Sequence, residues 1–116
     1  MLITIDPGSA EPLFEQLVSG IRSQVIDGTL REGERLPAAR DLADSLEVNV
    51  HTVLRAYQIL RDEAFIELRR GRGAVVAPRA HDYAQLAADI DRLVADARKL
   101  ELTAAALAAL VRKAYP

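Results

Sequence analysis

Two short helical patterns, separated by only two residues, constrain the fold of this chain more than any other feature. The first covers "AARDLADSL" (residues 38–46), and the second begins at Asn49 and continues through "VHTVLRAYQILRDEA" to residue 64. The intervening Glu47 and Val48 suffice only for a tight turn, and the Asn49 side chain is a good helix N-cap. This spacing predicts a helix-turn-helix motif, in which the second helix enters the major groove of DNA.

The second helix of this pair has an apolar side and a polar side. At about 100° per residue, the apolar side carries Val53, Ala56, Tyr57 and Leu60. The opposite side carries His51, Arg55 and Gln58, and Leu54 lies on the shoulder between the two. We expect the apolar side, including the Tyr57 ring, to pack on the core and the polar side to remain free for a partner.

The stretch "ELRRGRGAVV" (residues 67–76) places arginines at a sharp turn. Short apolar runs precede and follow the segment Arg70-Gly71-Arg72-Gly73. Glycine supplies the positive φ angles that such turns need, so the stretch predicts a β-hairpin with cationic side chains at its tip. Residues 49–72 contain five arginines against three acidic residues. Such a local cationic stripe is suited to contact with DNA phosphates.

The N-terminal segment precedes a third helical pattern. "LITID" (residues 2–6) alternates in apolar character and ends at Pro7 and Gly8, which predicts a short strand. Pro12 is suited to the first turn of a helix, which we expect to run to about Asp27 and to stop at Gly28. Apolar residues at helical spacing within it are Leu13, Phe14, Leu17, Val18, Ile21 and Val25.

Pro78 marks a change to an alanine-rich helical tail. A first helix carries a heptad-like seam formed by Tyr83, Leu86, Ile90, Leu93, Ala97 and Leu100. Thr103 is suited to cap a last helix, which carries Leu107, Leu110 and Val111. A helical hairpin of this size has little of its own chain to pack against, so we expect these apolar residues to bind a second subunit. Packing of the seam on its own domain is the alternative.

These elements together predict a mainly α fold with a small β-hairpin. We divide the chain into a winged helix-turn-helix DNA-binding domain, residues 1–77, and a short C-terminal helical hairpin for dimerisation, residues 78–116. With 116 residues, half of them hydrophobic, the chain has the size of one domain with an appendage.

Composition argues against several function classes. The chain has no cysteine, and its two histidines, His51 and His81, are too few for a zinc site. We find no nucleophile motif and no phosphate-binding loop, so we expect neither an enzyme nor a cofactor or metal site. The N-terminus is acidic where a signal peptide is positive, and no window approaches the roughly 18 apolar residues of a membrane span. We therefore expect a soluble, cytoplasmic protein without a membrane partner.

The order of these motifs resembles that of the winged-helix regulators of the GntR family, and the short helical tail resembles the YtrA-type subfamily. The matching pieces are "PLFEQL" (12–17), "GTLREGERLPAARDLADSLEVNVHTVLRAY" (28–57) and "AFIELRRGRGAVVA" (64–77). The resemblance implies a homodimeric regulator that binds double-stranded DNA sequence-specifically, and a repressor rather than an activator. Two-fold symmetry then implies an inverted-repeat operator with half-sites ~10 bp apart, or a multiple of that spacing.

The resemblance also assigns residues to DNA contact in three places: the first helix of the motif, the start of the recognition helix, and the wing tip. Gly73, like Gly71, matches a wing-tip position of the family. The predicted contacts are Arg40, then Asn49, His51, Thr52 and Arg55, then Arg70, Gly71 and Arg72. The wing arginines are expected to approach phosphate or the adjacent minor groove.

Three positions depart from the family's pattern. Many members carry glutamate at the position of Ala39 and arginines at the positions of Val50 and Leu54. Because these residues are apolar here, arginine-to-guanine recognition is lost at the last two, and Asn49 and His51 are expected to take more of the base recognition. Large members also carry an effector-binding domain, whereas only residues 78–116 follow here, so the sequence identifies no effector.

Other interpretations stay open. The fold can serve as a protein-interaction module whose hairpin arginines meet an acidic partner, without specific DNA binding. The chain also resembles the DNA-binding head of larger regulators fused to an aminotransferase-like domain, although we expect the tail ending in "KAYP" to be complete. Arg40 can instead pair with Asp44 on its own helix, and the hairpin arginines can be solvated.

Overall fold

The structure is a computed structural model that describes residues 1–78 and 83–116. The chain divides into two compact units, Met1–Ala84 and Gln85–Pro116. His81, to which the sequence assigns no role, lies outside the described residues. None of the helices in the described ranges has the length and apolarity needed to cross a bilayer.

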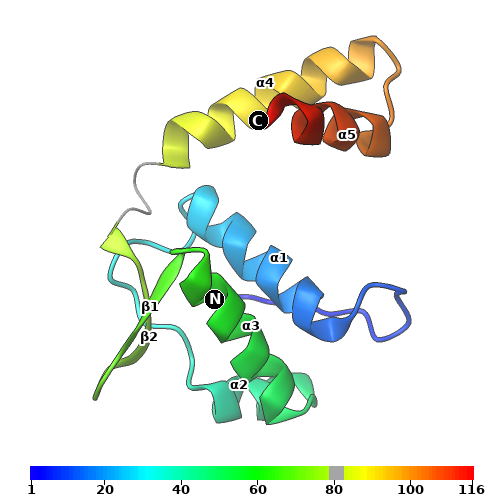
Figure 1. The fold of residues 1–116 in the computed structure, drawn as a ribbon. Coiled ribbons are helices and arrows are strands. Elements are labelled where there is room, and N and C mark those ends of the chain that lie inside the picture. The colour runs from blue at the N-terminus through cyan, green and yellow to red at the C-terminus, as the bar shows by residue number, and fades with distance from the viewer. Residues whose placement is uncertain (79–82) are drawn as a thin grey trace. The chain divides into compact units, whose positions relative to one another are not determined.

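Helix α1, Leu13–Ile26, forms where the apolar spacing predicts a helix (Figure 1). Pro12 occupies its N-cap, and Asp27 ends it directly before Gly28, as expected. The face toward the core buries Leu17, Val18, Ile21 and Val25.

The prediction of a strand over residues 2–6 is wrong, because this segment is not a strand and has no strand partner among the residues that the structure describes. Its polar backbone groups bond to side chains of α1 instead. The Gln16 amide accepts from the Asp6 N–H at 2.7 Å and donates to the Asp6 carbonyl at 3.0 Å. Ile3 and Ile5 are half-buried and pack against the core. The apolar alternation therefore reflects the packing of an extended arm on a helix.

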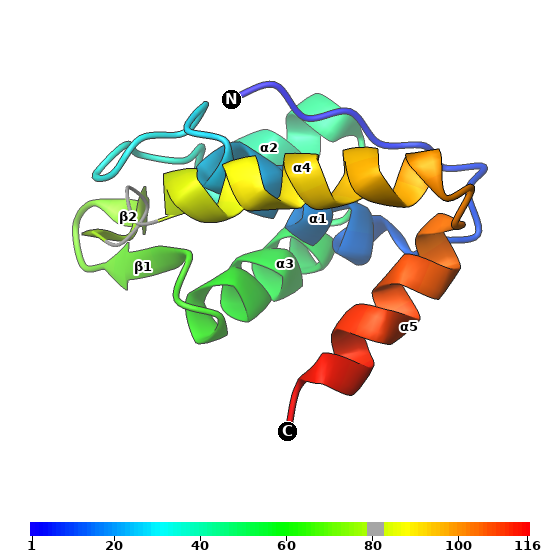
Figure 2. The same cartoon turned by 90° about the horizontal axis from the view of Figure 1, so that it is seen from above.

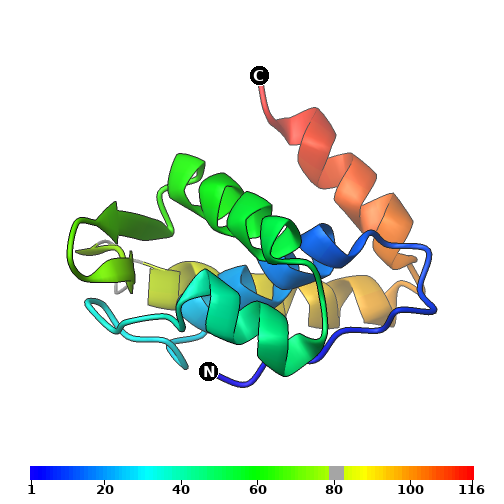
Figure 3. The same cartoon turned by 90° about the horizontal axis from the view of Figure 1, so that it is seen from below.

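Helices α2, Ala39–Leu46, and α3, Val50–Asp62, form the predicted helix-turn-helix (Figure 3). Between them Glu47 adopts a left-handed conformation with a φ of 58°. The Val48 N–H donates to the Ala43 carbonyl at 3.0 Å and closes the turn. Two residues thus suffice to redirect the chain from one helix into the other.

Strands β1, Ile66–Arg69, and β2, Gly73–Val76, form the predicted antiparallel hairpin. In its register Ile66 lies opposite Val76, and Arg69 lies opposite Gly73. The tip is therefore the segment 70–72, where Gly71 has a φ of 80° that favours glycine.

The loop before α2 pairs with the second edge of β2. The Leu36 N–H donates to the Ala74 carbonyl at 2.8 Å, the Gly33 N–H donates to the Val76 carbonyl at 2.9 Å, and Arg35 forms a β-bridge with Val75. This loop therefore acts as a short third strand that ties the start of α2 to the hairpin.

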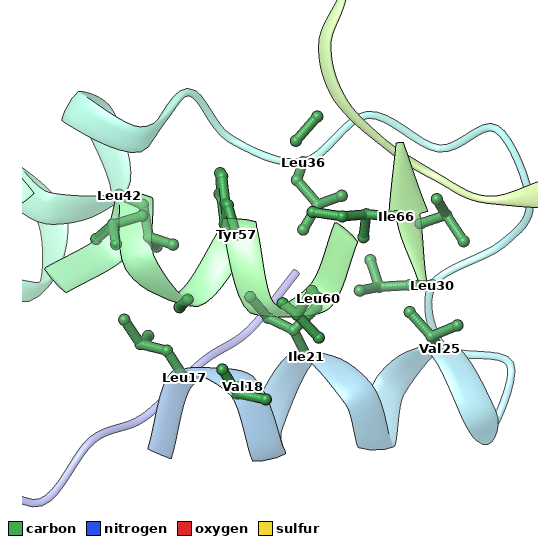
Figure 4. Packing of buried hydrophobic residues seen from close by; sticks show 14 of the residues in the cluster. Leu17, Val18, Ile21, Val25, Leu30, Leu36, Leu42, Tyr57, Leu60 and Ile66 are labelled. Carbon is green, nitrogen blue, oxygen red and sulfur yellow. The ribbon is translucent and has the colours of Figure 1, made fainter. Parts of the chain in front are cut away.

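The core of the first unit lies between α1, α3 and the hairpin (Figure 4). Its largest fully buried side chains include Leu17 and Ile21 of α1, Leu60 of α3 and Ile66 of β1. The predicted core face of α3, including the Tyr57 ring, is buried. The Tyr57 hydroxyl donates to the Pro37 carbonyl at 2.7 Å, which fixes the loop before α2 on the recognition helix.

The tail forms helices α4, Ala84–Lys99, and α5, Ala104–Ala114. Thr103 caps α5 as predicted, because its hydroxyl accepts from the Ala106 N–H at 3.1 Å. A tight turn joins the two helices, which diverge from it (Figure 2). The described residues thus contain five helices and one two-stranded hairpin, which confirms the predicted fold class of a winged helix-turn-helix domain followed by a helical hairpin.

Candidate nucleic-acid interface

The start of α3 presents an exposed surface on the side away from the core. His51, Leu54, Arg55 and Gln58 are exposed on it, and Thr52 is half-buried. Burial of the opposite side holds the helix rigidly on α1 and α2. This surface can therefore meet a rigid partner such as duplex DNA without rearrangement of the helix.

Asn49 acts both as a helix cap and as a candidate contact. Its side-chain oxygen accepts from the His51 N–H at 2.8 Å, so that oxygen is already engaged in the capping bond. The amide NH₂ is the donor left for a ligand, and a donor suits a phosphate oxygen or a base acceptor. The cap also fixes the backbone at His51, the next predicted contact.

Arg55 stacks on an aromatic ring of another helix. Its guanidinium carbon lies 3.7 Å from the centre of the Phe14 ring of α1, within the range of a cation–π interaction. Arg55 as a residue remains exposed, and a guanidinium stacked by its face can still donate from its edge N–H groups. The stack therefore limits the directions in which Arg55 can reach a ligand.

Arg40 lies exposed in the first turn of α2. The alternative ion pair with Asp44 does not form, and Arg40 makes no ion pair to any residue of the described ranges. Ala38 at the N-cap provides no side-chain hydrogen bond, so the first N–H groups of α2 remain open to an external acceptor. A cation beside open N–H groups is an arrangement suited to a phosphate.

The arginines of the hairpin fall into two groups. Arg69 forms an ion pair with Glu67 of the same strand at 2.6 Å, which offsets its charge. Arg70 and Arg72 at the tip are exposed and make no ion pair within the part of the chain that the structure describes. Positive φ angles at Gly71 and Gly73 form the turn that carries them.

A groove of about 530 Å³ separates the start of α2 and the recognition helix from the hairpin. Ala38 and Ala39, Leu54 and Leu68 line it, together with Arg69 and Arg70. Sequence reasoning did not identify this groove, because it depends on how the hairpin packs beside α3. It also placed Phe14 only in an apolar stripe, since spacing within α1 does not reveal a partner on α3.

The predicted dimerisation residues occupy different environments. Tyr83 lies in the first unit, where its ring centre is 5.2 Å from that of Phe65. Leu107 is half-buried. The exposed apolar residues are Leu86, Ile90, Leu93 and Leu100 of the seam and Leu110 of α5. Their role in association stays a prediction.

Among the residues that the structure describes, two groups have pKa values shifted by their surroundings, and neither is among the predicted DNA contacts. Hydrogen bonds from the Thr29 side chain and backbone lower the pKa of Asp27. Burial raises the pKa of Tyr57 well above its usual range. Across residues 1–78 and 83–116, no cluster of His, Asp or Glu side chains is suited to hold a metal ion.

Known proteins resemble this chain in sequence and in fold. Over 105 residues it is 40% identical to the HTH-type transcriptional regulator Rv1152 of Mycobacterium tuberculosis, a match that covers 87% of this chain and 84% of that protein. Over 79 residues it is 37% identical to the HTH-type transcriptional repressor YtrA of Bacillus subtilis; here the match covers 68% of this chain but only 61% of YtrA. The solved structure of YtrA from Sulfolobus acidocaldarius, a GntR-family transcription factor, superposes with a TM-score of 0.63 at 35% identity, over 82% of this chain and 99% of that one.

The match to a family extends over the whole helix-turn-helix and the wing. Residues 13–76 match the model of the gntR family of bacterial regulatory proteins, which is more than half of the chain. The relatives are transcription regulators and not enzymes, in agreement with the sequence expectation. By its winged helix-turn-helix and its short helical tail, the chain belongs to the GntR family of transcription regulators and is of the YtrA type.

Proposed function

We propose that this protein is a homodimeric, sequence-specific repressor that binds an inverted-repeat operator. The observation that carries the proposal is the exposed start of α3 together with three exposed arginines on neighbouring elements, Arg40 at the start of α2 and Arg70 and Arg72 at the wing tip. None of these three arginines is neutralised by an acidic side chain of the described residues. Unpaired cations next to an exposed, rigidly held helix are suited to contact with the phosphate backbone.

In this proposal α3 enters the major groove and the wing lies along the flanking backbone. His51, Arg55 and Gln58 project from α3 toward base edges, the Asn49 amide donates to a base edge or to a phosphate, and Arg40 donates to phosphates. The open N–H groups at the start of α2 add a backbone anchor for the same strand. Residues 1–77 then form the DNA-binding domain.

Residues 78–116 form the dimerisation tail in this proposal. Leu86, Ile90 and Leu93 of α4 are between 43% and 49% exposed, and Leu110 of α5 is 56% exposed. Apolar side chains at heptad-like spacing gain free energy when a second copy covers them, at about 25 cal/mol per Å². The two-fold symmetry of such a dimer requires two half-sites of inverted sequence.

Repression is proposed from the printed description of a relative, because YtrA of Bacillus subtilis is named a transcriptional repressor. A dimer bound across a promoter blocks transcription by occupying the site. Such a regulator acts in the cytoplasm, in contact with the chromosome.

Selection of genomic fragments on the purified protein tests this function, followed by titration of the best fragment at several salt concentrations. We expect an inverted repeat, a mass of two chains by sedimentation, and a linear fall of log affinity with log salt. Recovery of nothing above random DNA, with weak binding at every salt concentration, contradicts the proposal. That result favours the alternative function, a winged-helix module that binds an acidic protein partner.

A further inference from the structure

One apolar side chain lies among the polar groups of the recognition helix. Leu54 is 41% exposed, although leucine gains free energy from burial. His51 precedes it by three residues and Gln58 follows it by four, so both are its neighbours on the helix surface. A partner that meets His51 and Gln58 therefore covers Leu54 as well.

The arginine next to Leu54 does not take its place on this surface. Arg55 stacks on Phe14 of α1, whereas Leu54 lines the groove shared with the hairpin. Because the two side chains lean toward opposite sides of α3, the base edge that meets Leu54 receives no guanidinium from Arg55. Val50, one turn earlier, is half-buried against the core and gives this side of the helix a fixed position.

The chemistry of base edges limits what Leu54 can recognise. In the major groove every base pair presents hydrogen-bonding groups, but only thymine presents a methyl group; cytosine carries a single hydrogen at the same ring position. A leucine pressed against a polar edge removes its water without replacing the lost hydrogen bond, which is unfavourable. A leucine pressed against the thymine methyl buries two apolar surfaces.

We propose that Leu54 is a specificity-determining residue that contacts the C5-methyl group of one thymine in each half-site of the operator. This inference rests on the proposed function, because it requires α3 to lie in the major groove. It assigns to this chain a base preference at one position of the recognition helix.

Deoxyuridine substitution tests the contact directly, since deoxyuridine differs from thymidine only by the absence of the methyl group. Each thymine of one half-site in a selected fragment is replaced in turn, and the Kd of the unaltered protein and of Leu54→Ala is measured. We expect one position where deoxyuridine weakens binding of the unaltered protein about fourfold, the worth of about one buried methyl-sized group. Leu54→Ala is expected to bind the thymine and deoxyuridine fragments equally at that position.

Leu68→Ala is the matched control, because Leu68 is an equally exposed leucine that lines the same groove from the hairpin. It is expected to keep the full sensitivity to deoxyuridine. Circular dichroism checks that each variant folds, and Leu54→Ala removes only a partly exposed side chain. Two results overturn the inference: the unaltered protein binds equally well with deoxyuridine at every thymine, or deoxyuridine weakens the binding of Leu54→Ala as much as that of the unaltered protein. In either case specific binding to the fragment still supports the proposed function. If no fragment is selected, the proposed function fails and the inference fails with it.

Discussion

The guanidinium of Arg55 lies over the ring of Phe14, with its central carbon 3.7 Å from the ring centre. This stack joins the recognition helix to α1 at the exposed surface of the domain. A long side chain loses rotamer freedom when it binds a ligand. A neighbouring residue that already restricts the side chain before binding lowers this entropic cost. Phe14 is therefore a positioning residue for Arg55 in the proposed interface.

Phe14→Leu is expected to weaken binding to the selected fragment about twofold to fivefold, in line with about 0.5–1 kcal/mol for an exposed cation–π pair. Arg55→Ala removes the contact itself and is expected to cost about 1–3 kcal/mol. Measuring Kd for both single variants and the double variant separates positioning from packing. If Phe14→Leu weakens binding as strongly in the Arg55→Ala background as alone, Phe14 does not act through Arg55.

The hairpin offers a comparison between paired and unpaired arginines. Arg70→Ala and Arg72→Ala are each expected to reduce the slope of log affinity against log salt by about one, because each loses one phosphate contact. Arg69→Ala is the control, since Glu67 already offsets the Arg69 charge at 2.6 Å. The three slopes are measured on the same fragment. A larger change for Arg69→Ala than for the tip variants contradicts this assignment.

Asn49→Asp is expected to separate folding from DNA binding. Aspartate caps a helix about as well as asparagine, so the free energy of unfolding should change by less than about 0.5 kcal/mol. The new carboxylate replaces the donating NH₂ group and repels phosphate, so affinity for DNA should fall. Asn49→Ala, which loses the bond to the His51 N–H, is expected to cost about 1 kcal/mol of stability. Urea denaturation and Kd measurements on both variants test the two roles, and unchanged affinity in Asn49→Asp excludes a contact between the Asn49 amide and DNA.

The helices and the hairpin could be predicted because their signals are local. The buried face of α3 follows from residues spaced by three and four, and the cap at Asn49 and the turn at Gly71 depend on single residues. The strand predicted over residues 2–6 was wrong because alternation shows only that one side is apolar. Whether a strand forms depends on a partner, and here Gln16 of α1 bonds to the backbone of Asp6 instead.

The parts of the site that the sequence did not reveal depend on packing between distant segments. Phe14 and Arg55 lie on different helices, and helical spacing does not indicate which side chains meet across the interface. The groove beside Leu54 likewise depends on how distant segments pack, because the hairpin, α3 and the loop before α2 all line it. The spacing of apolar residues shows on which face of a helix a residue lies. Which residues of two elements touch depends on how those elements are positioned against each other.

Tyr57 is expected to make the stability of the first unit depend on pH in the alkaline range. Burial raises its pKa above the ordinary value of 10.0 in the folded protein, so the unfolded chain loses this proton first. Its contribution is fully present below pH 10 and is lost as pH rises further, by about 1.4 kcal/mol per pH unit. Tyr57→Phe also loses the bond to the Pro37 carbonyl, at a cost of about 1 kcal/mol at neutral pH. In urea denaturation the stability advantage of the unaltered protein over Tyr57→Phe should shrink between pH 9 and pH 11, and a constant difference contradicts this account.

Dimerisation through the tail predicts a sharp contrast between two faces of α4. Ile90 is 43% exposed on the apolar seam, and an aspartate there places a charge in the proposed interface. Ile90→Asp is therefore expected to sediment as one chain and to lose affinity for the inverted repeat, because each half-site alone binds more weakly. Ala88 is exposed on the opposite face of the same helix, so Ala88→Asp is expected to remain a dimer and bind normally. The first unit should unfold at the same urea concentration in both variants. Dimers of undiminished stability in Ile90→Asp would exclude this face of α4 as the interface between subunits.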